Sequence, residues 1–204
     1  MTRIILVRHG HVEGISPERF RGRADLPLTP DGRRQAQATA HRIHAAWAPS
    51  TVYTSPLGRC RATAEAIGKM FALSPHALEG LIDIDYGEWQ GLTPDEVRRR
   101  WPEALDTWYR APDWAAIPGG ETLQEVQARS VSAMRDVIAR HTNDTVVLVG
   151  HDSVNRVILL HAFQLPLARY WGLAQRPCAI NEIVFAEGNF TILSLDETWH
   201  LSGL

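Results

Sequence analysis

The sequence predicts an α/β protein with a layered fold, in which helices cover a central and mainly parallel sheet. Short segments rich in β-branched residues alternate along the chain with longer segments in which apolar residues recur at helical spacing. Two of the short segments, residues 2–7 (TRIILV) and 145–150 (TVVLVG), are continuous apolar runs, which suit strands buried on both faces of a parallel sheet. The 204 residues suit one large domain or one domain with an insertion.

The first half of the chain supplies two strands and two helices. Residues 2–7 form the first strand, and the turn sequence PLTPDG leads into a helix over residues 31–47. A short strand, TVYT, follows at residues 51–54. We expect the next helix to begin with Ser55 as its N-cap and Pro56 at its first helical position, because both residue types are favoured there.

Residues 80–120 differ in character and predict an inserted, cap-like segment within a single domain over residues 1–204. Prolines and glycines punctuate this segment, and it has no sheet pattern. Four of the seven tryptophans of the chain lie in it: Trp89, Trp101, Trp108 and Trp114. Two interpretations of these tryptophans stay open, namely local packing within a small subdomain and an apolar wall over a pocket.

The second half returns to the alternating pattern. Residues 121–141 carry apolar side chains at helical spacing and predict a long helix. After the apolar strand already named, residues 154–163 are typical of a further helix. Residues 178–195 predict a β-hairpin that turns at Gly188-Asn189.

Composition and charge exclude several classes of protein. Hydrophobic residues make up 45% of the chain, enough for a core, and the net charge of −2 gives no reason to expect a nucleic acid or membrane partner. Two cysteines argue against a disulfide framework and fit a reducing compartment. No apolar stretch approaches the ~18 residues of a membrane-spanning helix, and the N-terminal run is typical of a strand rather than a signal peptide. We therefore expect a cytoplasmic protein.

Side chains that can carry positive charge follow three of the predicted strands. Arg8 and His9 come directly after the first strand. His151 ends the apolar run TVVLVG, and Arg59 lies in the first turn of the helix after TVYT. Because ligands of open α/β sheets bind at the carboxyl ends of the strands, we expect these four side chains to meet at one edge.

The position of Arg59 indicates what that edge binds. A helix N-terminus carries a partial positive charge and disfavours a cation unless an anion joins it. Helix N-termini bind phosphate, and arginine contacts phosphate through two parallel hydrogen bonds. A solvated Arg59 is the alternative when that residue is taken alone, but the convergence of four such groups in a mildly acidic protein favours a phosphate site.

Other chemistries lack their motifs in this sequence. There is no G-x-x-x-x-G-K-[ST] loop, no H-E-x-x-H or paired C-x-x-C for zinc, and no G-x-S-x-G elbow. Two arginines in the pocket would also repel a metal ion. Histidine is left as the candidate nucleophile, and we expect neither a metal nor a cofactor.

Five segments in order resemble the histidine phosphatase superfamily, the phosphoglycerate mutase-like proteins. LVRHG resembles the R-H-G signature, ERFRGRADLPLTPDGRRQA the segment after it, and TSPLGRCRATA the S-P-L-x-R-A-x-x-T-A motif, with Cys60 at the usual alanine. LIDIDYGEWQG resembles the acid-bearing segment L-x-E-x-x-x-G-x-x-x-G, and VLVGHDSVNRVIL the second histidine motif. Each motif alone is moderately specific, but their order through most of the chain is highly specific.

The resemblance implies a three-layer α/β/α sandwich and a role for each matched residue. His9 would form a phosphohistidine, while Arg8, Arg59 and His151 would hold the phosphoryl oxygens. One carboxylic acid would protonate the leaving oxygen and then activate water. Asn181 would support the pocket or contact the substrate.

Two departures from the family pattern limit what the resemblance implies. The usual glutamate of the acid segment is Asp83 here, one methylene shorter, and Glu88 and Asp85 are the alternatives as the acid. After the signature the chain reads HVEGI, so the usual acid and hydroxyl are replaced. Glu13 either contacts the substrate or lies on the surface. His11 either adds a titrating cation near the pocket or is a solvated loop histidine.

These patterns favour a phosphomonoester hydrolase that acts on a small phosphorylated metabolite. The alternative is phosphoryl transfer within a phosphoglycerate or phosphosugar, as in the mutases, which are generally longer and shield the phosphohistidine from water. A catalytically inactive phosphate-binding module is the third hypothesis. A homodimer is a further expectation, in which a surface tryptophan such as Trp199 would lie in the interface.

Overall fold

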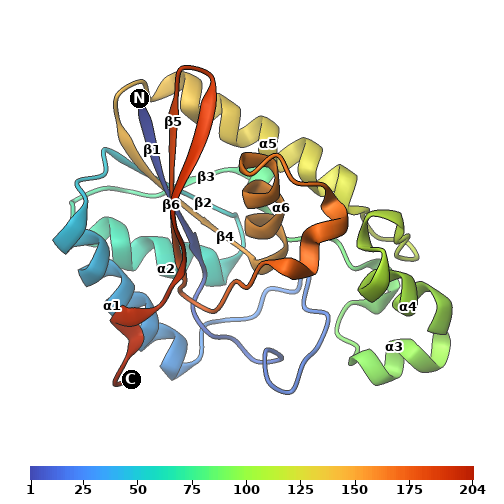
Figure 1. The fold of residues 1–204 in the computed structure, drawn as a ribbon. Coiled ribbons are helices and arrows are strands. Elements are labelled where there is room, and N and C mark those ends of the chain that lie inside the picture. The colour runs from blue at the N-terminus through green and yellow to red at the C-terminus, as the bar shows by residue number, and fades with distance from the viewer.

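One six-stranded sheet forms the centre of the computed structural model, which describes all 204 residues (Figure 1). The strand order across the sheet is β3-β2-β4-β1-β5-β6. The strands are β1 (Thr2–Arg8), β2 (Thr51–Thr54), β3 (His76–Ala77), β4 (Thr145–Gly150), β5 (Ile180–Ala186) and β6 (Asn189–Glu197). The first four strands are parallel to one another. The β5–β6 hairpin extends the sheet beyond β1, with β5 antiparallel to β1 and β6 antiparallel to β5.

Helices cover both faces of this sheet. The long helices are α1 (Pro30–Ala46), α2 (Gly58–Lys69), α5 (Leu123–Arg140) and α6 (Asp152–Ala162). Helices α1 and α2 pack together on one face, and α5 and α6 pack together on the other (Figure 1). The predicted three-layer α/β/α sandwich with a mainly parallel sheet is therefore confirmed.

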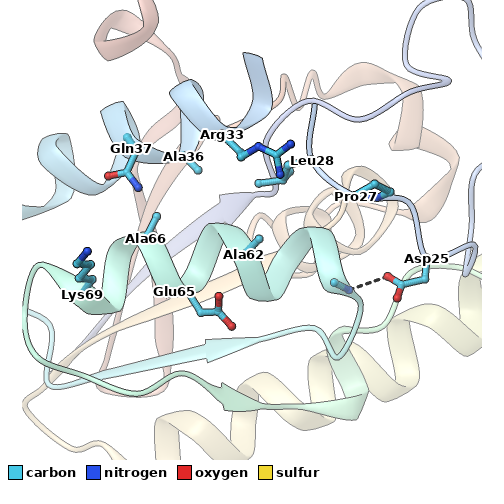
Figure 2. Close-up of a pocket in the computed structure, with 11 residues that line it drawn as sticks. Asp25, Pro27, Leu28, Arg33, Ala36, Gln37, Ala62, Glu65, Ala66 and Lys69 are labelled. Atoms are coloured by element: carbon cyan, nitrogen blue, oxygen red, sulfur yellow. Dashed lines mark hydrogen bonds between the residues drawn. The ribbon is translucent and has the colours of Figure 1, made fainter. Parts of the chain in front are cut away.

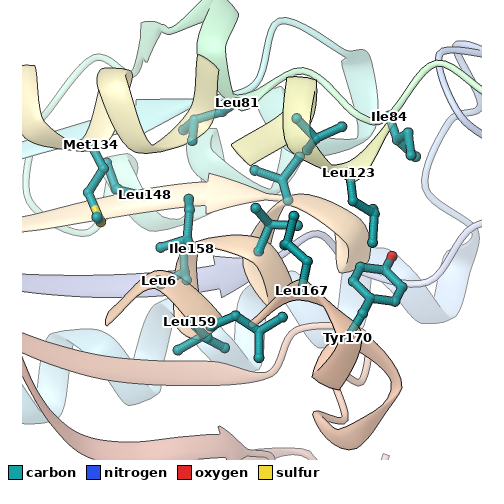
Figure 3. Packing of buried hydrophobic residues seen from close by; sticks show 14 of the residues in the cluster. Leu6, Leu81, Ile84, Leu123, Met134, Leu148, Ile158, Leu159, Leu167 and Tyr170 are labelled. Carbon is teal, nitrogen blue, oxygen red and sulfur yellow. The ribbon is translucent and has the colours of Figure 1, made fainter. Parts of the chain in front are cut away.

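The alternation of side chains along β1 and β4 fills two cores at once. Ile4 and Leu6 point into the large apolar cluster under α5 and α6, part of which Figure 3 shows. Ile5 and Val7 point into the smaller cluster under α1 and α2. Since both faces are buried, β1 is apolar at every position from Ile4 to Val7, which explains its continuous run of hydrophobic residues.

The predicted long helices are present, and side chains cap them. Thr29 accepts a hydrogen bond from the Gly32 amide at the start of α1. At the start of α5, Thr122 and Glu125 form a capping box, in which each side chain accepts from the other's backbone amide.

The start of α2 corrects the sequence prediction. The helix begins at Gly58 rather than at Pro56, and Ser55 does not cap it. Instead, Oδ1 of Asp25 accepts the Gly58 amide at 2.8 Å, so a residue far away in the sequence caps the helix. The hydroxyl of Ser55 turns toward His151 instead, where it lies 2.7 Å from Nε2.

The hairpin turn also lies one residue earlier than predicted. Ala186 pairs with Asn189, so the two turn residues are Glu187 and Gly188. Their φ angles are 53° and 80°, the positive values that a tight two-residue turn of this kind requires at both positions. Gly188 supplies one of them freely, and Glu187 adopts the other despite its side chain.

Residues 79–120 form short helices over the carboxyl edge of the sheet and contribute no strand to it. They comprise α3 (Pro94–Arg100), α4 (Pro102–Arg110) and three single 3₁₀ turns. Trp89 and Trp108 are buried in the large core, whereas Trp114 is 81% exposed. Gly87 has a φ of 46° and touches the backbone at residues 118–120, which leaves no space for a side chain.

Two surface features bear on partners. The strand β6 forms one edge of the sheet, and Trp199, just beyond it, is 83% exposed. None of the helices combines the length and apolar character that crossing a membrane requires.

The contact between α1 and the loop after β1 yields a prediction about stability. A Cβ added at Gly32 would overlap the carbonyl oxygen of His11, which is backbone and cannot easily move away. We expect Gly32→Ala to lower the free energy of unfolding by about 1–3 kcal/mol, the usual cost of overpacking. Urea unfolding measures this change. The matched control is Gly172→Ala, whose Cβ would meet no atom within 4 Å, and an equal loss in both variants would contradict the account.

Candidate functional site

The two strand-end histidines meet at the carboxyl edge of the sheet. Arg8 pairs with Gly150 in the parallel β1–β4 register, so His9 and His151 follow at the same level. Their ring centroids lie 5.2 Å apart with an interplanar angle of 63°, and both side chains are buried. The prediction that the two apolar runs end side by side is therefore correct.

Two arginines complete this cluster, and both are buried. Arg8 donates to the carbonyl of Gln175 and lies 3.8 Å from a carboxylate oxygen of Asp152. Burial lowers the pKa of Arg8, although the Asp152 carboxylate opposes this effect.

Arg59 extends from the first turn of α2 and has no exposed surface. Its terminal nitrogens donate to the carbonyls of Ala24 and Gly22, each at 2.6 Å. One of them also donates to Oδ2 of Asp83 at 3.0 Å.

The Nε groups of Arg8 and Arg59 have no hydrogen-bond partner although both are buried. A buried donor without an acceptor costs about 1–3 kcal/mol, and more when it is charged. An anion with several oxygen atoms would supply the missing acceptors.

His9 is arranged as a neutral imidazole with one nitrogen available for attack. Its Nδ1 lies 2.7 Å from the carbonyl oxygen of Gly10, which only accepts hydrogen bonds, so Nδ1 carries the proton. Burial lowers the pKa of His9 well below its ordinary value, and the charges of Arg59 and Arg8 lower it further. The lone pair of the neutral ring then lies on Nε2.

His151 is held in one orientation by Ser55 and Asp83. The Ser55 hydroxyl accepts the Leu57 amide at 3.4 Å and lies 2.7 Å from Nε2 of His151. On the other side of the ring, Nδ1 faces Oδ2 of Asp83 at 3.5 Å, and a carboxylate oxygen there favours the tautomer with its proton on Nδ1. Burial and the neighbouring Arg59 lower the pKa of His151 well below its ordinary value, so this ring is also neutral at neutral pH.

Asp83 joins the cluster from the segment before α3 and is 7% exposed. Its Oδ1 accepts from the Ile84 amide at 3.0 Å and from the hydroxyl of Ser153, while Oδ2 accepts from Arg59. Three donors thus fix the carboxylate beside the two histidines. Of the three acids considered from the sequence, Asp83 is the one that reaches them.

A small cavity of about 50 Å³ opens onto His9 and Asp83. Trp108 and Trp171 supply apolar walls, so Trp108 both packs in the core and lines the pocket. The remaining lining residues are Glu18, Arg19, Phe20, Arg21, Gly22, Tyr86, Asp152 and Ser153. Sequence reasoning named none of these eight, nor Trp171. The only available signal for the eight was their place in matched motifs: residues 18 to 22, residue 86 in the acid-bearing segment, and the two residues directly after His151.

Of the predicted site residues, His9 and Asp83 line this cavity, whereas Arg8, Arg59 and His151 adjoin them but are not among its lining residues. Four other candidates lie elsewhere. Glu88 is exposed, and its backbone amide donates to Pro118; Glu13 is exposed in the loop after the signature. The ring of His11 contacts Thr29 at the start of α1.

The fourth candidate, Asn181, is buried beneath the site rather than in it. Its side chain exchanges two hydrogen bonds with the side chain of Gln175, at 2.8 and 2.9 Å. The carbonyl of Gln175 in turn accepts from Arg8. Asn181 therefore contacts the cluster of Arg8, His9, Arg59 and His151 only through this neighbour.

The larger hollow shown in Figure 2 is a different place. It measures about 470 Å³, lies between α1 and α2, and is lined by charges of both signs, such as Arg33, Lys69 and Glu65. None of the four convergent cation-capable side chains lines it. Chemistry rather than volume therefore identifies the candidate site. The molecule contains no group of three or more histidine, cysteine, aspartate or glutamate side chains arranged to hold a metal ion.

Comparisons with known proteins agree with this geometry. The family model described as "Histidine phosphatase superfamily (branch 1)" matches residues 4–198. Phosphoserine phosphatase 1 of Hydrogenobacter thermophilus is 31% identical over 201 residues, which cover 98% of this chain and 95% of that protein. The metal-independent phosphoserine phosphatase of Arabidopsis thaliana is 30% identical over 207 residues, covering 100% of this chain and 85% of that protein.

A solved structure has the same fold as this chain. Bacillus stearothermophilus YhfR superposes with a TM-score of 0.93 at 30% identity and covers 98% of this chain and 100% of its own. All of these matches, to the family model, to the relatives and to the solved structure, extend over nearly the whole chain. The chain therefore belongs to the histidine phosphatase superfamily, as a hydrolase of small phosphorylated metabolites.

Proposed function

We propose that the chain hydrolyses phosphomonoesters in two steps, with His9 as the nucleophile and a phosphohistidine as the intermediate. The observation that carries this proposal is the pair of unpartnered Nε–H groups, on Arg8 and Arg59, buried beside a neutral imidazole. In the first step, Nε2 of His9 attacks phosphorus as the bond to the leaving oxygen breaks. In the second step, water attacks the phosphohistidine, which releases phosphate and restores the imidazole.

Arg8, Arg59 and His151 hold the phosphoryl oxygens during both steps. The two guanidinium groups supply charge and their free Nε–H donors, and His151 supplies the Nδ1–H that now faces Asp83. The helix α6 begins at Asp152, directly after His151, so its N-terminal amides lie at the same edge. Donors that are already in place stabilise the charge of the transition state without reorganisation.

Asp83 is the general acid of the first step and the general base of the second. It lines the cavity beside His9, where a leaving oxygen would lie. In the first step its carboxyl group gives a proton to the leaving oxygen. After the proton has passed to the leaving group, the carboxylate accepts a proton from the attacking water.

The lining of the cavity supports a small, charged leaving group. Glu18 carries the opposite charge to Arg19 and Arg21, and all three line the cavity with the two tryptophans. Phosphoserine, the substrate named for two relatives, has both an ammonium and a carboxylate group in its leaving portion. We take a phosphoamino acid of this kind as the substrate class, hydrolysed without a metal because cationic side chains offset the charge.

The sequence-based expectations about location and assembly stay predictions. Both cysteines, Cys60 and Cys178, are free and buried, which supports a reducing compartment such as the cytoplasm. The exposed Trp199 beside the edge strand β6 supports a homodimer.

Product analysis with two substrates tests the function. With phosphoserine we expect steady release of inorganic phosphate. With 3-phosphoglycerate we expect no formation of 2-phosphoglycerate. The His9→Ala variant is the inactive control. Formation of 2-phosphoglycerate without release of phosphate would show a mutase instead.

The acid role of Asp83 predicts a dependence on the leaving group. Asp83→Asn removes the proton donor, so kcat/KM for phosphoserine should fall by about 10²–10⁴-fold. For 4-nitrophenyl phosphate, whose leaving group needs no proton, kcat/KM should change by less than about tenfold. Glu88→Gln, in the same segment but exposed, is the control and should leave both values unchanged. Wild-type activity of Asp83→Asn on phosphoserine would rule out this role.

A further inference from the structure

Arg129 makes a set of hydrogen bonds that are needed neither for packing the core nor for the contacts among Arg8, His9, Arg59 and His151. It lies on α5, and its guanidinium group uses all five of its N–H donors. Three of them go to backbone carbonyls of one short segment: Gly80 at 3.0 Å, Ile82 at 2.6 Å and Asp83 at 3.2 Å. The other two go to the carboxylate of Glu121, both at 2.9 Å.

Glu121 connects the same segment a second time. While it pairs with Arg129 through both oxygens, it also accepts the backbone amide of Asp85 at 3.0 Å. The Glu121 amide donates back to the carbonyl of Asp85 at 2.9 Å. The Arg129–Glu121 pair therefore fixes residues 80–85 on both sides of Asp83.

Asp83 needs this support because its side chain is short. It has one methylene fewer than the glutamate typical of the family motif, so it has one torsion less with which to adjust its reach. Its carboxylate also meets three donors at once, from Ile84, Ser153 and Arg59. A short side chain can keep these three contacts only if the backbone holds Asp83 in one place.

We propose that Arg129 is a positioning residue for Asp83, acting through the carbonyl groups of residues 80, 82 and 83. This inference rests on the proposed role of Asp83 as the general acid. Arg129 does not line the cavity, and all its donors are occupied, so it has none left for a substrate. Its hydrogen bonds act on catalysis by holding the acid in place, because small displacements of a catalytic group cost rate steeply.

The test measures kcat/KM for a series of phosphate esters that runs from 4-nitrophenyl phosphate to phosphoserine. Arg129→Lys keeps the charge and most of the stem, but one ammonium group cannot reach three carbonyls and both carboxylate oxygens. We expect it to lower kcat/KM for phosphoserine by about 10- to 100-fold and for 4-nitrophenyl phosphate by less than about threefold. Arg140→Gln, at the exposed end of the same helix, is the matched control and should change neither value.

A double variant separates positioning from a general structural role. Asp83→Asn already lacks the acid, so adding Arg129→Lys should slow phosphoserine hydrolysis by less than about threefold more. Equal losses on all esters, or multiplied losses in the double variant, would overturn the proposal. So would loss of the fold in Arg129→Lys, since its role would then be stability.

The same series keeps this inference apart from the proposed function. If Asp83→Asn shows no dependence on the leaving group, the acid role itself fails. If Asp83→Asn shows that dependence and Arg129→Lys does not, the acid role stands and the positioning role of Arg129 fails.

Discussion

The site depends on two guanidinium groups that are buried with incomplete partners. Arg8 and Arg59 lie at the carboxyl edge of the sheet, each with an Nε–H that has no acceptor in the chain. Their counterions are Asp152 for Arg8, at 3.8 Å, and Asp83 for Arg59, at 3.0 Å. Burying a charged group with an unpaired donor is unfavourable unless a ligand supplies the missing acceptor. A phosphoryl group has both the negative charge and the oxygen atoms to do so.

The same two cations explain the state of the histidines. Positive charge and burial both disfavour protonation, so the pKa values of His9 and His151 fall well below the ordinary range. A protonated His9 would have no lone pair for phosphorus. Under the proposed mechanism, the two arginines that bind the phosphoryl group would therefore also keep the nucleophile His9 neutral.

The sequence predicted the parts of this design that strands position. Arg8, His9 and His151 follow continuous apolar runs, and a parallel sheet necessarily brings the ends of such runs together. The N-cap prediction for Ser55 was wrong, although a serine before a proline is typical of an N-cap. In the folded chain Ser55 contacts His151, and Asp25 accepts the hydrogen bond from the first amide of the helix. The hairpin turn was misplaced by one residue, because Glu187 tolerates a positive φ that the pattern assigned to glycine and asparagine.

Loop residues were the hardest to predict. Arg19 and Arg21 line the cavity from a segment without periodicity, and Arg129 looks in the sequence like any arginine on a helix. What makes Arg129 distinctive is the carbonyl groups it reaches across the fold, and no local pattern records those. Which residues of a loop line the site can be predicted only once the sheet positions the two ends of that loop.

The central claim, covalent catalysis by His9, is tested most directly by trapping the phosphoenzyme. The protein is mixed with radiolabelled phosphoserine, quenched in alkali, and analysed for label on the polypeptide. Wild-type protein should carry an acid-labile, alkali-stable label on the peptide that contains His9, and His9→Ala should carry none. Steady hydrolysis by the wild type without any such label, or the same label on His9→Ala, would contradict the account.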